Sequence, residues 1–180
     1  MLPAALAAVL IVSSCGGSDE ASTTDESSTV DSAVGSEVVG HYADGVYVSY
    51  AASVESATKM GDDIEAFLDD PTEDTLATAR KAWLTARPDY GVTEAFRFYG
   101  GPIDADDTGP EGRLNAWPMD ESYVDYVEGD PEAGIINDPD EYPTLDTDTL
   151  ASLNEAGGET NVSTGWHAIE FLLWGQDLSE

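Results

Sequence analysis

The 180-residue chain has few of the side chains on which common hydrolytic sites depend. It contains a single cysteine, Cys15, and two histidines, His41 and His167. A lone cysteine excludes an intramolecular disulfide. Neither the H-E-x-x-H pair of zinc peptidases nor the G-x-S-x-G elbow of serine hydrolases occurs. The residues present therefore disfavour hydrolysis.

Basic side chains are also scarce. Six Lys and Arg residues stand against 37 Asp and Glu residues, which gives a formal net charge of −31. A nucleic-acid partner is excluded, because a phosphate backbone needs a basic footprint. The acids are scattered along the chain, which favours a solvated acidic surface. Such a surface would also raise the local concentration of cations.

Long apolar runs are lacking as well. The stretch from Leu2 to Val12 is too short to cross a bilayer, which takes about 20 residues, but it has the length of a secretory h-region. The following "VSSC" resembles the lipobox of bacterial lipoproteins, although no Lys or Arg precedes it. We predict that residues 1–15 are a lipoprotein signal peptide and that Cys15 is lipidated. The protein is then extracytoplasmic, in the cell envelope or periplasm, and lipid-anchored to the membrane. An ordinary signal peptide with a chance cysteine is the alternative.

Residues 16–37 form a second region of distinct composition. They are rich in Ser, Thr, Asp, Glu and Gly and have almost nothing to bury. Such segments remain disordered, so we predict an acidic tether here. The folded part is expected to begin near Val38 and to extend to residue 180.

The folded part carries helical periodicity. Apolar residues between Val39 and Phe67 recur at steps of three, four and seven, which describes one helix face. Pro71 is expected to end this helix, and Thr72 to cap the next one. The second helix should run from residue 73 to the Gly100-Gly101-Pro102 stop, with a kink or division at Pro88.

The remainder is expected to alternate loops with short helices. Residues 102–120 are dense in Gly, Pro and Asp and predict a long ordered loop. Short helices are predicted at residues 121–127 and 147–154, followed by a final helix with Ser163 or Thr164 as its cap. No stretch has the alternation of a strand, so the fold class is predicted to be all-α.

The final helix carries a histidine and a glutamate three residues apart in "TGWHAIEFLLWGQD". Positions i and i+3 are neighbours on one helix face, so His167 and Glu170 could reach one ion. A histidine in the first turn favours the neutral imidazole that binds metals. The spacing fits equally well a polar pair satisfied inside a helix bundle, for example by Arg97. One histidine with carboxylates would suit iron, zinc or another divalent cation.

The segment "GWHAIE" (165–170) resembles the G-x-H-x-x-E signature of the imelysin family. Further stretches resemble the subgroup called iron-regulated protein A, namely residues 82–104, 112–129, 134–143 and 161–177. The likeness covers nearly everything after residue 38. It implies an all-α fold built from two bundle-like halves, with the signature facing a cleft between them. Residues 38–180 are then expected to be one half of this duplicated architecture, truncated at its C-terminus.

The resemblance also implies a site and a function. The implied metal ligands are His167, Glu170, Glu94 and Asp104, and the implied cleft residues are Arg97, Arg113 and Asn115. The cation would be Fe or Zn, and no residue is assigned a catalytic role. The leading hypothesis is a lipid-anchored metal-binding protein for iron uptake or an iron-responsive envelope function, with envelope transport proteins as partners. The alternatives are a metal-dependent peptidase of the imelysin type and a ligand- or partner-binding envelope module without metal.

Overall fold

The computed structural model describes residues 32–106 and 108–178, and within them the fold is all-α, as predicted. The only β pairing in this part is an isolated bridge between Val127 and Asp130. Cys15 and the predicted signal segment lie outside the described residues. The helices are α1 (Ser32–Asp69), α2 (Glu73–Thr93), α3 (Glu111–Asn115), α4 (Glu121–Val124), α5 (Thr147–Leu153) and α6 (Gly165–Trp174), with 3₁₀ helices η1 (Glu94–Phe96) and η2 (Ile135–Asn137).

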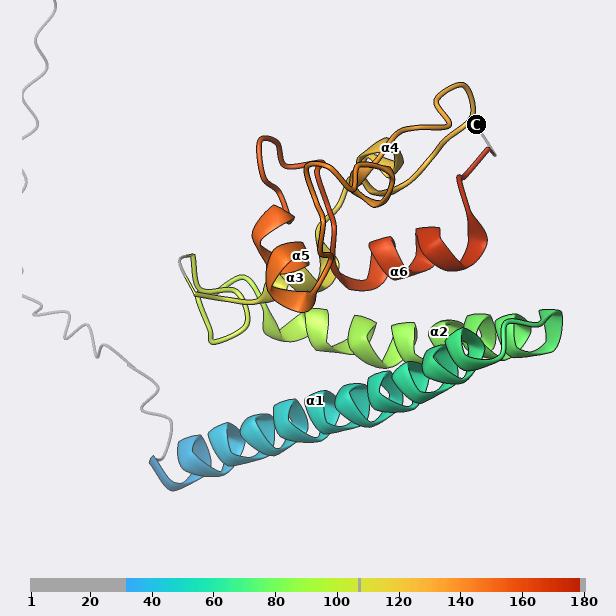
Figure 1. Ribbon diagram of the computed structural model, residues 1–180. Coiled ribbons are helices and arrows are strands. Elements are labelled where there is room, and N and C mark those ends of the chain that lie inside the picture. The colour runs from blue at the N-terminus through green and yellow to red at the C-terminus, as the bar shows by residue number, and fades with distance from the viewer. Residues whose placement is uncertain (1–31, 107, 179–180) are drawn as a thin grey trace, which may run out of the picture.

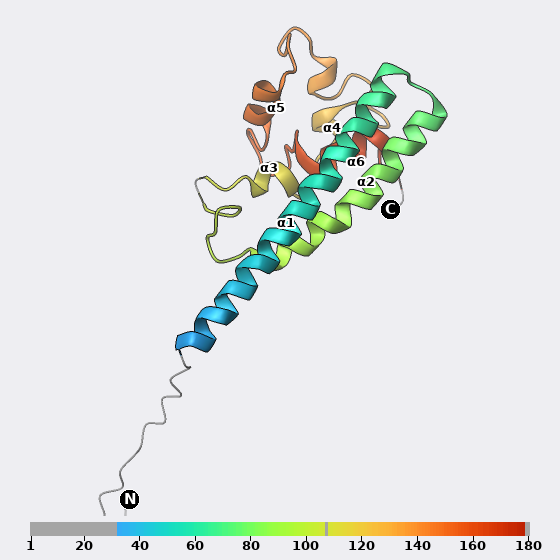
Figure 2. The same cartoon turned by 90° about the horizontal axis from the view of Figure 1, so that it is seen from below.

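Two long helices form the base of the molecule. In Figure 1, α1 and α2 run antiparallel, and α6 crosses on the side of α2 that faces away from α1. In the same view α4 lies above α6, and α3 and α5 lie beside the start of α6. Figure 2, seen from below, places α1 and α2 in front of α6 and shows the first half of α1 projecting beyond the body. In the described ranges, no helix combines the length and apolar composition needed to cross a bilayer.

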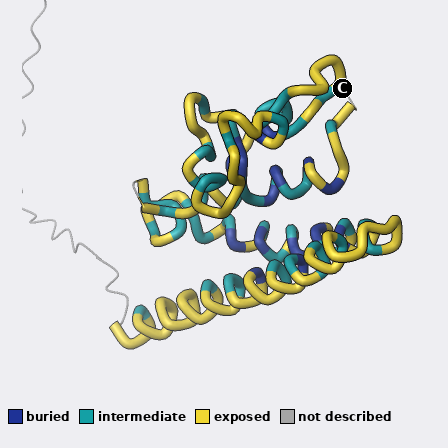
Figure 3. The backbone as a smooth tube through the Cα atoms, in the orientation of Figure 1, coloured by how far each residue is buried: buried dark blue, intermediate teal, exposed yellow. Residues whose placement is uncertain are grey.

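The contact between α1 and α2 uses the C-terminal part of the predicted apolar face, whereas Val39, Tyr42 and Val54 of that face are exposed. Met60 of α1 is buried with Ala79 and Trp83 of α2, while Ile64 and Phe67 pack against this cluster. Burial is confined to the second half of α1, and the first half is largely exposed (Figure 3). The core therefore lies where α1, α2 and α6 overlap.

Helix α1 begins earlier than its predicted start near Val38. Residues 32–37, predicted as the end of a disordered tether, are helical from Ser32 onward. Val34 and Val38 extend the i, i+4 spacing of the apolar residues by one more turn. The tether prediction is therefore corrected for these residues.

The boundaries of α2 agree with the prediction at one end only. The Thr72 hydroxyl accepts a hydrogen bond from the Thr75 N–H at 3.2 Å, and the Thr75 hydroxyl accepts one from the Thr72 N–H at 3.0 Å. This capping box confirms Thr72 as the cap. Helix α2 continues through Pro88 and is not divided. Pro88 lacks the donor to the Leu84 carbonyl and its ring crowds that carbonyl, but Leu84 is exposed to water, which can hydrate the freed oxygen.

The other end of α2 differs from the prediction. The helix ends at Thr93 instead of at Gly100-Gly101, because the chain passes through η1 and then turns at Phe98, which has a positive φ of 74°. The predicted loop at residues 102–120 contains the short helix α3. The short helices predicted at 121–127 and 147–154 are present as α4 and α5, and α4 already ends at Val124.

Candidate functional site

The entry into α6 depends on Gly165. This residue has φ +86°, and a Cβ built on it would lie 2.4 Å from the carbonyl oxygen of Leu114. A side chain would therefore meet both the positive φ and the backbone of α3. The glycine of the signature allows the start of α6 to lie directly against the end of α3.

The hydroxyl groups of the two residues before Gly165 fix the position of this entry. Thr164 is the N-cap residue, as predicted, but its side chain makes no capping hydrogen bond. Its hydroxyl donates instead to the Arg113 carbonyl at 2.9 Å. The Ser163 hydroxyl donates to the Leu150 carbonyl at 2.8 Å. Both residues thus tie α6 to α3 and α5.

Side chains of α2 hold the remainder of α6. The Trp83 indole N–H donates to the Trp166 carbonyl at 3.0 Å, and the two rings pack edge to face with centroids 6.2 Å apart. The Arg80 Nε donates to the Leu173 carbonyl at 2.7 Å. A cation at the C-terminal end of a helix also opposes the negative end of the helix dipole. The first and last turns of α6 are therefore fixed by partners far away in sequence.

The His–Glu pair lies on an adjacent face of α6, beside Trp117 and Glu121. The His167 Nδ1 is 3.4 Å from Glu170 Oε2. This contact does not have the geometry of a hydrogen bond, and the buried Nδ1 has no other hydrogen-bond partner. The imidazole is 18% exposed and the carboxylate 44% exposed. The Trp117 ring lies 4.7 Å from the imidazole, centroid to centroid. The predicted pairing of His167 with Glu170 is thus present, and one ring nitrogen remains unused.

This pair opens onto a cavity of about 460 Å³. Glu121, at the start of α4, lines the same cavity and was not identified from the sequence. One of its carboxylate oxygens accepts the Asp177 N–H at 3.1 Å, which connects α4 to the segment after α6. No spacing within the sequence relates Glu121 to His167, because their proximity arises from the folding of α4 over α6.

Glu94 does not join this pair. Its carboxylate lies 3.8 Å from Arg87 and 3.7 Å from Arg97, and it accepts the Asn115 side-chain N–H at 3.1 Å. Arg97 is also paired with Glu111. Two partly buried guanidinium groups in this part of the fold require carboxylates beside them. The implied ligand Glu94 and cleft residues Arg97 and Asn115 are therefore members of one polar network.

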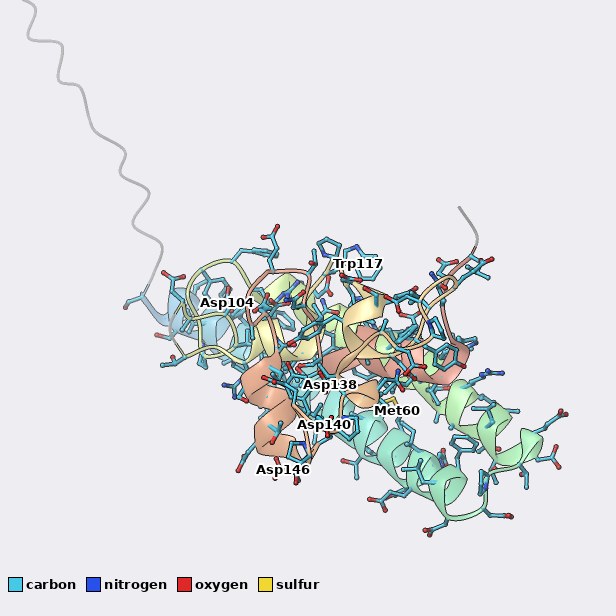
Figure 4. The ribbon with its side chains drawn as sticks, turned by 45° about the horizontal axis from the view of Figure 1, so that its top comes forward. Met60, Asp104, Trp117, Asp138, Asp140 and Asp146 are labelled. Carbon is cyan, nitrogen blue, oxygen red and sulfur yellow. The ribbon has the colours of Figure 1, made fainter. Side chains whose placement is uncertain are left out.

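Asp104 and Arg113 make other contacts in this structure and do not join the His–Glu pair. The Asp104 carboxylate accepts the backbone N–H groups of Gly101, at 2.9 Å, and of Phe98, so it closes a loop. Figure 4 shows Asp104 well away from Trp117, the residue that contacts His167. Arg113 contributes its carbonyl to Thr164, and the residue is exposed. Among the described residues, no three His, Cys, Asp or Glu side chains are grouped to hold a metal ion. The predicted set of four ligands is not assembled.

The helical base and the glycine-led helix with its His–Glu pair define an all-α protein of the imelysin type. The model of the imelysin family matches residues 46–180, and the chain belongs to this family. The protein is also 35% identical over 75 residues to "Iron-regulated protein A" of Synechococcus elongatus. That match covers 42% of this chain and 20% of the relative, so the chain aligns with about a fifth of the relative's length. The family resemblance of the sequence is confirmed.

Proposed function

We propose that this chain is an extracytoplasmic, lipid-anchored imelysin-family protein that binds an iron or zinc cation through His167 and Glu170. It would serve iron uptake or an iron-responsive function of the cell envelope. One observation carries the proposal, namely the unpartnered His167 Nδ1 located 3.4 Å from a carboxylate at the edge of a cavity. The name of the relative from Synechococcus elongatus supports a link to iron.

The donor set is compatible with these cations. Imidazole suits iron and zinc, and a carboxylate supplies a compensating negative charge. Zinc sites use four protein ligands, or three when a water molecule completes the shell. The pair would provide two ligands, and Glu121 lines the same cavity. A net charge of −31 favours the approach of any cation.

The proposal is tested by calorimetric titration of the full chain with Fe²⁺ under anaerobic conditions and with Zn²⁺. Excess Ca²⁺ in the buffer occupies scattered surface carboxylates, which suit a hard cation and not an imidazole site. His167→Ala should weaken binding at least about tenfold, a loss of ~1.4 kcal/mol. His41→Ala is the matched control, because His41 is exposed on α1. Equal affinities of the two variants would contradict the proposal.

The anchoring part of the proposal rests on the lipobox-like sequence and has its own test. In a bacterial host that processes lipoproteins, the expressed protein should take up radiolabelled palmitate and fractionate with membranes. Cys15→Ala should release it from the membrane fraction without a change in cation affinity. Membrane association that persists in this variant would exclude Cys15 as the anchor.

A further inference from the structure

The His167 imidazole has no hydrogen bond that fixes its orientation. Its buried Nδ1 is without a partner, and the contact with the Glu170 carboxylate at 3.4 Å lacks hydrogen-bond geometry. A histidine that ligates a metal is normally oriented by a hydrogen bond from its other ring nitrogen to a carboxylate, a carbonyl or water. In the part of the chain that the structure describes, no protein group supplies such a bond to Nδ1. Another contact must therefore direct this ring.

The Trp117 indole makes such a contact. Its ring centroid lies 4.7 Å from that of the imidazole, and the two planes are inclined by 49°. Both residues line the cavity beside Glu170. Flat rings at such a separation attract each other, and each limits the rotation of the other. The indole is thus placed to restrict the imidazole on the side that Glu170 does not contact.

The backbone around Trp117 is held independently of the indole. Residues 116–120 connect α3 to α4, and Ala116 at the start of this segment is buried. At its end, the Asp120 N–H donates to the Thr160 carbonyl at 2.8 Å, and the Asp120 side chain caps α4. Trp117 itself, labelled in Figure 4, is 69% exposed. The ring can therefore be removed without releasing the segment that carries it.

We propose that Trp117 is a positioning residue of the cation site, which holds the His167 imidazole in the orientation that binds the cation. This role rests on the proposed function, because it concerns the same His–Glu pair. A ring that rotates freely must be immobilised when the cation binds, and the lost freedom lowers the affinity. The contact with Trp117 restricts this rotation before binding. Trp117 would thus act through His167 without touching the cation itself.

Calorimetric titration of the full chain with Zn²⁺, with the same excess of Ca²⁺, tests this role. Trp117→Ala should weaken Zn²⁺ binding about tenfold, the smaller of the losses seen when a group that orients a metal-binding histidine is removed. Trp117→Phe keeps a ring beside the imidazole and should recover most of the affinity. Tyr126→Ala is the matched control, because Tyr126 is 64% exposed and does not line this cavity. Unchanged affinity in Trp117→Ala, with His167→Ala still weakened, would overturn the positioning role and leave the cation site standing.

The metal-free protein gives a second readout by nuclear magnetic resonance. The chain has two histidines, so isotope-labelled histidine reports on His167 and on the exposed His41 alone. The ring current of the indole should displace the His167 ring-proton signals, and Trp117→Ala should abolish this displacement while the His41 signals stay in place. Identical His167 signals in the two proteins would refute the contact. A displaced signal in a wild-type protein that does not bind Zn²⁺ or Fe²⁺ would overturn the proposed function and, with it, the role of Trp117.

Discussion

The two faces of α6 differ in how far their side chains are buried and their polar groups hydrogen-bonded. On one face, Trp166 and Leu173 are buried against α2 and their carbonyls accept bonds from Trp83 and Arg80. On the other face, His167 and Glu170 adjoin an open cavity, and the imidazole Nδ1 has no hydrogen-bond partner. The family signature therefore combines residues that position the helix with residues that the packing does not need.

The largest loss of folding stability is expected from Gly165→Ala. The new Cβ would lie 2.4 Å from the Leu114 carbonyl oxygen at a positive φ, so α6 would have to leave α3. We expect destabilisation of more than about 4 kcal/mol, or failure to fold. Gly175→Ala is the control, because Gly175 also has a positive φ, of +84°, but no atom within 4 Å.

For the control, backbone strain alone should cost about 1–3 kcal/mol. Urea unfolding followed by circular dichroism measures both variants. Similar losses of unfolding free energy in the two variants would show that the contact between Gly165 and α3 does not hold α6 in place.

The next largest loss of stability is expected at Trp83, which packs against α6, and it is compared with that at Trp117, which lies beside His167. Trp83→Ala removes a buried ring and the indole bond to the Trp166 carbonyl, which should cost about 3–5 kcal/mol. Trp117→Ala removes a ring that is 69% exposed beside His167, and should cost less than about 1 kcal/mol. The same urea titration checks the ranking. A larger loss for Trp117 would mean that the cavity side also supports the fold.

Glu170→Gln should separate binding from stability. The side chain is 44% exposed, so the free energy of unfolding should change by no more than about 0.5 kcal/mol. Affinity for Zn²⁺ should nevertheless fall at least about tenfold, because a charged ligand is lost. Glu94→Gln should lower the free energy of unfolding and leave the affinity for Zn²⁺ unchanged, because the Glu94 carboxylate contacts Arg87, Arg97 and Asn115. Calorimetry and unfolding of both variants test this reversal.

The smallest change in stability is expected from substitution of Asp146, which lies outside α6. The pKa of Asp146 is lowered because the Thr149 N–H donates to its carboxylate at the start of α5. A lowered folded-state pKa stabilises the fold above the unfolded value, near pH 4, and this contribution is lost as the pH falls through the folded-state pKa. Asp146→Ala should therefore lower the melting temperature slightly at neutral pH only. A difference that persists in strong acid would exclude the charge as its cause.

Local patterns predicted much of this structure. The spacing of apolar residues located the face of α1 that packs on α2, and Thr72 marked the start of α2 because a capping box depends on neighbouring residues. The contact between His167 and Glu170 was predictable for the same reason, since helix geometry alone brings i and i+3 together.

Tertiary contacts could not be predicted in this way. The i, i+3 spacing of Glu94 and Arg97 is compatible with an ion pair, but the sequence does not reveal that Arg87 and Asn115 also converge on the same carboxylate. Asp104 closes its own loop through backbone N–H groups, which no composition pattern separates from a ligand role. Glu121 was missed because only the placement of α4 beside α6 brings it to the cavity.

The way in which α6 is held also has a consequence for the order of folding. A ten-residue helix is too short to be stable alone in water. Its bonds reach across 51 residues to Arg113 and across 93 residues to Arg80, whereas α1 and α2 are joined by a short turn. Contacts of long sequence separation form slowly, so α6 should dock after the α1–α2 pair has formed. A cation held by His167 and Glu170 together with Glu121 of α4 would then fasten this last segment to the rest of the fold.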